Sequence, residues 1–303
     1  MTGATGLIGA SLVSALHERG AEVTVLARDP ERARERLPRT GTGGEIETVG
    51  WDPLEREAPA EALDGRDAVV HLAGEPVAQR WSASAKRAIR DSRVTGTRNL
   101  VAGISHASAK PALLISASAV GYYGAHGEEP LDEETPPGSD FLARVCAEWE
   151  AAAAAARTLG LRVVQVRTGV VLDRSGGALA KMLVPFRLGV GGPVAGGRQF
   201  MPWIHLQDVV GIMLAAVEDE RWTGPVNAAA PEPVSNREFS KALGRVLSRP
   251  ALLPIPGFAL RALYGEMAAI VTSGARALPA KALVLGHQFA YPELEPALRA
   301  ALS

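Results

Sequence analysis

The sequence predicts an α/β protein in which helices cover both faces of a doubly wound parallel sheet, with a smaller, mostly helical C-terminal lobe. Short apolar runs alternate with stretches of helical periodicity through the first half of the chain, as in repeated β-α-β units. The runs "DAVVHLAG" and "PALLISAS" are continuously apolar, as expected of strands buried on both faces. A glycine loop, "TGATGLIG", stands near the N-terminus.

Each expected element follows from its local pattern. Behind the glycine loop, Leu12, Val13 and Leu16 share one helical stripe, and Gly20 ends that helix. A long alanine-rich helix is expected over 140–160, and a helical pattern also covers 82–104. Strands are expected where β-branched and apolar residues cluster, at 21–28, 45–52, 67–74, 111–118 and 161–172.

Composition excludes several classes of protein. The chain has 303 residues, is 47% hydrophobic and carries a formal net charge of −1, which argues against disorder and against a surface that coats nucleic acid. Its single cysteine excludes a disulfide framework, and the six histidines show no metal-ligand spacing. The apolar stretch 209–217 is too short to span a bilayer. We therefore expect a cytoplasmic protein that binds neither nucleic acid nor membrane.

The glycine loop predicts a dinucleotide site of the Rossmann type. Gly3, Gly6 and Gly9 allow a tight turn, a close approach to a diphosphate, and close packing of the following helix. The helix N-terminus then supplies free N–H groups to the phosphates. The next expected strand ends at Arg28, where an acidic residue would bind the ribose of NAD, so the sequence favours NADP(H). A solvated arginine in a charged surface run is the alternative.

The strand that should precede this loop is missing. Only Met1 and Thr2 come before Gly3, although the first strand of a doubly wound sheet is central. Without it, about four to eight backbone groups on its neighbours would lose partners, at about 1–3 kcal/mol for each buried group. We therefore expect a truncated first strand here and a native start that lies upstream.

The character of the chain changes near residue 173. A glycine-rich stretch at 187–203 is typical of a mobile loop, and short helical pieces separated by prolines follow from residue 230. We expect an NADP-binding domain of residues 1–172 plus 204–229, and a substrate lobe of residues 173–203 plus 230–303.

Several ordered motifs resemble one protein family. "TGATGLIG", "HLAG", "VTGTRNL" and "SASAVGYYG" are similar to the extended short-chain dehydrogenase/reductases. "HLAGEPV", "VCAEWE", "RTGVVL", "WIHLQD" and "ALPAKALVLGHQFAYPELEPAL" resemble more closely an atypical group, the sugar-nucleotide-epimerase-like epimerase family proteins. The resemblance covers essentially the whole chain. It implies a homodimer and the following cofactor contacts: Gly3, Thr5, Gly6, Leu7, Ile8, Arg28, Asp52, Leu72, Ala73 and Gly74. For Asp52, a simple turn before Pro53 is the alternative.

The same resemblance shows that the usual proton relay is absent. Typical members place a tyrosine and a lysine four residues apart on one helix, after a serine on the preceding strand. Ser118 fits the serine, but alignment on Glu150 puts Leu142 and Cys146 at the tyrosine and lysine places. Arg93 stands where an asparagine is usual.

Other residues are candidates for the missing roles. Tyr122 and Tyr123 follow Ser118 and would present a phenol to a substrate, unless they only pack under the loop. We expect substrate contacts at Glu75, Arg198 and His205, with solvated or structural side chains as the alternatives. Asp208 fits a helix N-cap, and Cys146 a small buried residue.

Two functions remain open from the sequence. The first is an NADP(H)-dependent oxidoreductase or epimerase-like enzyme that acts on a small carbonyl or nucleotide-sugar-like substrate, with Ser118, Tyr122 and Tyr123 as its catalytic residues. The second is a non-catalytic NADP(H)-binding sensor or scaffold, which the loss of the tyrosine and lysine favours.

Overall fold

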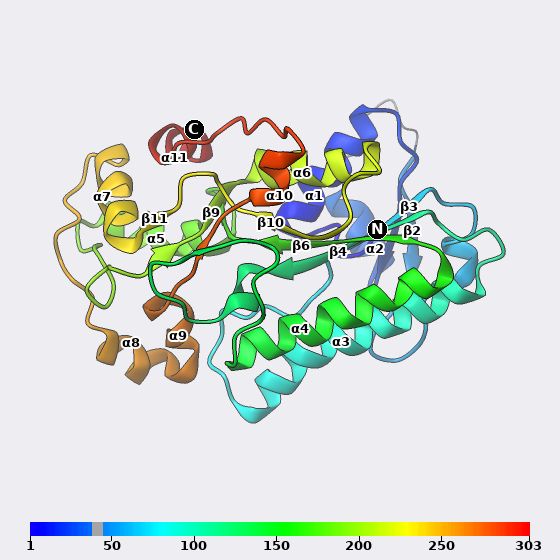
Figure 1. Cartoon of the computed structure of the whole chain (residues 1–303), viewed down its shortest axis with the longest axis horizontal. Coiled ribbons are helices and arrows are strands. Elements are labelled where there is room, and N and C mark those ends of the chain that lie inside the picture. The colour runs from blue at the N-terminus through cyan, green and yellow to red at the C-terminus, as the bar shows by residue number, and fades with distance from the viewer. Residues whose placement is uncertain (38–44) are drawn as a thin grey trace.

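The computed structural model describes residues 1–37 and 45–303, and its centre is a parallel sheet (Figure 1). Helices cover both faces of this sheet, as the sequence predicts. On one face α1 (Leu7–Glu18) packs beside α6 (Leu206–Glu218), and on the other α3 (Ala83–His106) packs beside α4 (Phe141–Ala154). The strands pair in parallel in two groups, β2-β1 and β3-β4-β6-β10, with these bounds: β1 Thr24–Ala27, β2 Glu47–Gly50, β3 Ala68–His71, β4 Leu113–Ala119, β6 Arg162–Thr168 and β10 Gly224–Ala228.

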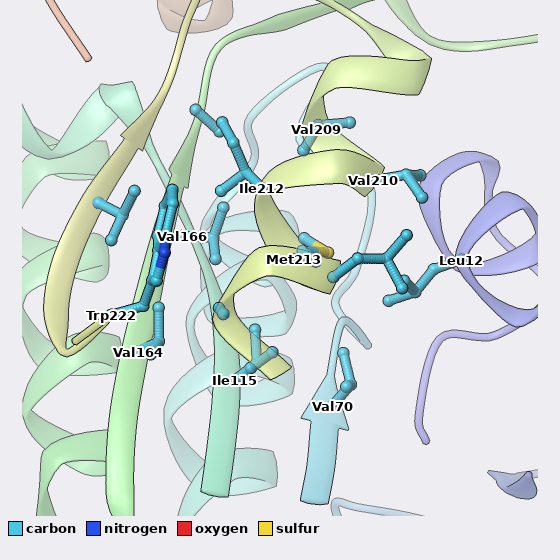
Figure 2. Close-up of a cluster of buried hydrophobic side chains, with 14 of the residues drawn as sticks. Leu12, Val70, Ile115, Val164, Val166, Val209, Val210, Ile212, Met213 and Trp222 are labelled. Carbon is cyan, nitrogen blue, oxygen red and sulfur yellow. The ribbon is translucent and has the colours of Figure 1, made fainter. Parts of the chain in front are cut away.

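Side chains of each central strand alternate between two apolar layers. On β4, Ile115 joins the cluster under α1 and α6, where Leu12 and Met213 meet the sheet (Figure 2). Its neighbour Leu114 joins the opposite cluster, under α3 and α4. Because successive side chains of a strand point to opposite faces, a strand covered on both faces needs an unbroken apolar run.

Thr2 lies between β1 and β3, where the carboxyl end of the expected first strand would be. It forms parallel bridges to Leu26 of β1 and to His71 of β3. Its N–H donates to Val70 O at 2.9 Å, and its carbonyl oxygen accepts from Leu72 N at 3.2 Å. One residue thus joins the two groups of strands, as expected of a truncated first strand.

His71 makes stability depend on pH. The ring is fully buried, with Nδ1 2.7 Å from the Thr2 hydroxyl, and burial lowers its pKa from 6.5 to about 4. Between these values the unfolded chain binds a proton that the folded protein does not, so acid favours unfolding. We expect the free energy of unfolding, measured in urea, to fall as the pH is lowered from 6.5 to 4. His71→Asn should make that dependence shallower; an equal slope in both proteins would contradict the assignment.

The remaining elements form short connections around the sheet and a lobe at its carboxyl end. The expected strand at 161–172 breaks at Gly169, where a Cβ would lie 2.7 Å from Pro202 O, and the chain continues as β7 beside β9. The expected loop at 187–203 contains β8 and the start of β9. The bounds are α2 Pro30–Arg36, η1 Ala60–Ala62, η2 Val120–Tyr123, β5 Pro130–Leu131, η3 Ala155–Leu159, β7 Val170–Leu172, α5 Gly177–Arg187, β8 Phe200–Met201, β9 Trp203–His205, β11 Val234–Ser235, α7 Asn236–Val246, α8 Gly257–Tyr264, η4 Gly265–Ala268, α9 Ala269–Thr272, β12 Arg276–Ala277, α10 Ala280–Val284 and α11 Leu294–Leu302.

A separate apolar cluster holds the lobe together, with α5, α7 and α11 as its main contributors. The two domain boundaries expected from the sequence stay a prediction.

No helix within residues 1–37 and 45–303 has both the length and the apolar character that crossing a membrane requires.

Candidate functional site

The glycine loop lies directly on backbone at the end of β3. Gly3 has a φ of +66°, and a Cβ there would lie 2.6 Å from the carbonyl carbon of Leu72. A Cβ on Gly9 would lie 2.2 Å from Gly3 O, so α1 also touches the loop. Side chains at these positions would push the loop away from the sheet.

The N-terminus of α1 is suited to an anion. Gly6 is the N-cap, and among the described residues no side chain caps it. The first-turn N–H groups of a helix have no partner within the helix, and the helix dipole adds partial positive charge there. Thr5 is exposed, and Leu7 and Ile8 are half-buried in the first turn. These residues fit a dinucleotide diphosphate.

Arg28 is positioned as the cofactor prediction requires. It directly follows β1, is exposed, and has no hydrogen bond or ion pair with any described residue. The neighbouring carboxylate of Asp29 caps α2 by accepting from Arg32 N at 3.0 Å. The Arg28 guanidinium is therefore available to bind a phosphate at this strand end, whereas the Asp29 carboxylate is hydrogen-bonded to the start of α2.

Asp52 forms the turn that was the alternative to its cofactor role. Its Oδ1 accepts from Leu54 N at 2.9 Å, two residues after the end of β2. The residue is half-buried at the carboxyl end of the strand. The cofactor contact remains a prediction for Asp52, because the hydrogen bond to Leu54 N does not exclude it.

The segment after β3 brings Leu72, Ala73 and Gly74 toward Arg93 of α3. A Cβ on Gly74 would lie 3.2 Å from Arg93 Cζ. Arg93 Nη1 donates to Glu75 O at 2.9 Å, and burial lowers the pKa of this guanidinium. A half-buried cation thus stands beside the strand end where the resemblance puts cofactor contacts. In the sequence, Arg93 stands out only because typical family members have an asparagine at this position.

Glu75 is an expected substrate contact, but its carboxylate already accepts a hydrogen bond from within the protein. Its Oε1 accepts from Gln79 Nε2 at 3.3 Å, and its backbone N–H donates to the Ser92 hydroxyl at 2.9 Å. Glu75 does not line the large cavity described below.

Ser118 belongs to a buried ionic network. Its hydroxyl donates to Glu150 Oε1 at 2.6 Å, and only 4% of the residue is exposed. Arg167 of β6 pairs with both oxygens of the same carboxylate, at 2.8 and 2.9 Å. Burial lowers the pKa of the guanidinium, but the hydrogen bonds and charge of Glu150 outweigh it and raise that pKa. The Ser118 hydroxyl is thus directed at Glu150.

The two candidate tyrosines pack on the same guanidinium. Tyr123 is fully buried, and its hydroxyl accepts from Arg167 Nη1 at 3.0 Å and lies 2.8 Å from Asn227 Oδ1. Burial raises the pKa of Tyr123 to about 12. The Tyr122 ring lies under Arg167, with Cζ 3.5 Å from its centroid, and burial also raises its pKa. Neither phenol is poised to lose a proton, so this geometry favours their packing role, and the catalytic role stays a prediction.

The places of the missing tyrosine and lysine are apolar. Leu142 of α4 lines the large cavity. Cys146, one turn later, is buried, and burial raises the pKa of its thiol to about 12. This cysteine is neither a cation nor a thiolate, in agreement with its expected structural role.

A cavity of about 690 Å³ opens between the sheet and the lobe. Val120 and Gly121, just after β4, form one wall with Phe141 and Leu142 of α4. The opposite walls come from α5, β8 and the segment from α8 to Ala275. The cavity is close to the glycine loop, because a Cβ on Gly177, which precedes the lining residue Ala178, would lie 3.5 Å from Leu7 Cδ2. This volume is typical of small-molecule sites.

The remaining predicted site residues lie away from the cavity wall. Arg198 is exposed, while its neighbours Gln199 and Phe200 line the cavity. His205 is the N-cap of α6, where Nδ1 accepts from Gln207 N at 3.2 Å. The expectation that Asp208 caps this helix is wrong, because its carboxylate accepts from Ala290 N and Tyr291 N instead. Within the described parts of the chain, no group of His, Cys, Asp and Glu is arranged to hold a metal ion.

Comparisons with known proteins extend over the whole chain. Residues 1–229 match the family described as the NAD dependent epimerase/dehydratase family, and residues 255–301 match a domain of unknown function, DUF1731. An epimerase family protein of Arabidopsis thaliana, a chloroplastic SDR39U1 homolog, is 41% identical over 306 residues, covering 100% of this chain and 86% of that protein.

Solved structures give the same result. The crystal structure of human epimerase family protein SDR39U1 (isoform 2) with NADPH has a TM-score of 0.86 and 36% identity, covering 100% of this chain and 98% of that one. A nucleoside-diphosphate sugar epimerase from Corynebacterium glutamicum has a TM-score of 0.78 and 35% identity, covering 99% of this chain and 57% of that one. The predicted fold is confirmed by these similarities.

Proposed function

Because this chain belongs to the NAD dependent epimerase/dehydratase family, as its motifs predict, we propose that it is an NADP(H)-dependent oxidoreductase or epimerase-like enzyme for a small carbonyl or nucleotide-sugar-like substrate. The observation that carries the proposal is an uncapped helix N-terminus close to a cavity of about 690 Å³, with an exposed arginine following β1. A cytoplasmic location and a homodimer remain part of the proposal.

Each part of the cofactor has a matching region of this chain. The amides at the start of α1 and the loop at Gly3, Thr5, Gly6, Leu7 and Ile8 would hold the diphosphate. Arg28 would bind the ribose phosphate that distinguishes NADP from NAD. The human relative was crystallised with NADPH, which supports this choice. Leu72, Ala73 and Gly74 would line the nicotinamide side, beside the half-buried guanidinium of Arg93.

The reaction that this arrangement would support is hydride transfer to a carbonyl group bound in the cavity, and bound NADPH would supply the hydride. The substrate carbonyl carbon would accept it, the π electron pair would move to the oxygen, and that oxygen would take a proton. Because no tyrosine, lysine, histidine or cysteine is among the described lining residues, and the lining carboxylates of Asp140 and Glu266 are engaged with Ala143 N and Lys86, we assign this proton to water.

A second function, a non-catalytic NADP(H)-binding sensor, is favoured by one specific observation. The hydroxyls of Ser118 and Tyr123 are hydrogen-bonded inside the Glu150–Arg167 network. Leu142 and Cys146 supply no proton in their place. A sensor would need the cofactor loop and the fold, but no acid or base.

The experiment that separates these functions measures binding and turnover in one preparation. NADPH is titrated by its fluorescence. Benzaldehyde and cyclohexanone are then added with NADPH while loss of its absorbance is followed, and UDP-glucose is added with NADP+ while gain of NADPH absorbance is followed. A change of absorbance with any of them supports the enzyme. Saturable NADPH binding without turnover supports the sensor, and no NADPH binding contradicts both.

A further inference from the structure

The cavity wall identifies a substrate class that the family assignment leaves open. We propose that the cavity binds an uncharged, apolar carbonyl compound, one with an aromatic or aliphatic body, and that it does not bind a nucleotide sugar. The carbonyl part of this inference rests on the proposed function. The apolar part rests on the lining side chains alone.

Most of the wall is hydrocarbon or aromatic. Side chains of this kind come from the sheet edge, from α4 and α5, and from the C-terminal lobe, and so surround the cavity. They are Trp81, Val120, Phe141, Leu142, Val170, Ala178, Met182, Val194, Phe200, Met201, Pro202, Ala269, Ile270, Val271 and Ala275. Such walls favour ligands that bury apolar area.

The uncharged polar side chains of the wall already have protein partners. Gln199 Nε2 donates to Val194 O at 3.1 Å and to Val271 O at 2.9 Å, and Asn236 Oδ1 accepts from Val194 N at 2.8 Å. The hydroxyls of Thr272 and Ser273 donate to backbone carbonyls of the preceding turn. A sugar would bury several hydroxyl groups here and would find few free partners for them, which costs binding free energy.

The charged side chains of the wall also disfavour a diphosphate. Arg261 is the only cationic side chain among the described lining residues, whereas both Asp140 and Glu266 carry carboxylates. Asp140 caps α4 by accepting from Ala143 N at 2.9 Å, and Glu266 forms an ion pair with Lys86. Tight diphosphate binding uses several charge-assisted hydrogen bonds. A largely apolar wall with one guanidinium and two carboxylates does not provide them.

The reacting end of the cavity is apolar as well. Leu142 replaces the phenol that would contact a substrate oxygen in typical relatives, and Val120 and Gly121 lie beside it. An uncharged ketone, aldehyde or quinone needs only room for its carbonyl group and an apolar fit for its body.

The test measures ligand binding without requiring turnover. The full chain, with and without NADPH, is titrated with N-phenyl-1-naphthylamine, a neutral probe that fluoresces in apolar surroundings. Benzophenone and UDP-glucose are then compared as competitors. We expect saturable binding of the probe, with benzophenone displacing it at concentrations at least about tenfold below those of UDP-glucose.

Two matched variants locate the probe. Ile270→Asp places a carboxylate in the wall at a residue that is 37% exposed, and should weaken probe binding by about tenfold or more. Phe258→Asp removes an aromatic ring that is 77% exposed on α8 and outside the lining, and should leave binding unchanged. Circular dichroism checks that both variants fold like the parent.

The outcomes separate this inference from the proposed function. Displacement by UDP-glucose at concentrations equal to or below those of benzophenone would overturn the inference, as would equal probe binding by Ile270→Asp and the parent. Probe binding located at Ile270, in a protein that never binds NADPH, would support the apolar cavity and contradict the proposed function.

Discussion

Replacing Arg28 with alanine is expected to weaken NADPH binding about 10- to 100-fold and to leave NADH binding almost unchanged. A charge-assisted hydrogen bond contributes about 1.5–3 kcal/mol, and NADH lacks the phosphate that this guanidinium would bind. Arg28 is exposed and has no partner among the described residues, so its loss should not disturb the fold. Isothermal titration calorimetry of both nucleotides gives the two dissociation constants.

Arg36→Ala is the matched control for this experiment. It removes the same charge from an exposed position in the last turn of α2. NADPH binding should be nearly unaffected, because only a nearby guanidinium forms the short-range contact. An equal loss of NADPH and NADH affinity in Arg28→Ala, or an equal loss of NADPH affinity in both variants, would show that Arg28 does not select the cofactor.

Replacing Arg167 with methionine is expected to lower the free energy of unfolding by about 3–5 kcal/mol, because it leaves a buried carboxylate without its partner. The guanidinium side chain is 3% exposed and that of Glu150 is 10% exposed. The same change removes the donor to the Tyr123 hydroxyl. Urea unfolding followed by tryptophan fluorescence measures the loss.

Two comparisons make this test specific. Arg221→Met breaks an ion pair with Asp219 on the surface, and should leave stability unchanged within error because solvent screens exposed pairs. The double variant Arg167→Met, Glu150→Leu removes both charges and should recover part of the loss. If Arg167→Met were as stable as the parent, the network would not hold Ser118 and Tyr123 in place.

Much of the fold is predictable from local pattern. The continuous apolar runs at β3 and β4 indicate strands buried on both faces, and Gly160, with a φ of +88°, ends the helical segment as expected. The glycine loop is predictable because its chemistry depends on adjacent residues. The spacing of Gly3, Gly6 and Gly9 along the chain is therefore enough to predict the loop.

The candidate site is predictable only in part, because its remaining features depend on distant residues. Ser118 meets Glu150 and Arg167 across separate elements, and no local pattern indicates that its hydroxyl will be engaged there. His205 and Asp208 are adjacent to a predicted helix start, yet only the packed C-terminal segment shows which one caps it. The cavity wall is assembled from segments between Trp81 and Ala275, so its apolar character is visible only in the folded chain.

Calorimetry of the unmodified protein with NADPH tests the central claim, that the start of α1 and Arg28 together bind a phosphorylated dinucleotide. We predict a saturable heat at one nucleotide per chain, with NADPH bound more tightly than NADH. The absence of heat with both nucleotides, from protein that circular dichroism shows to be folded, would contradict the account.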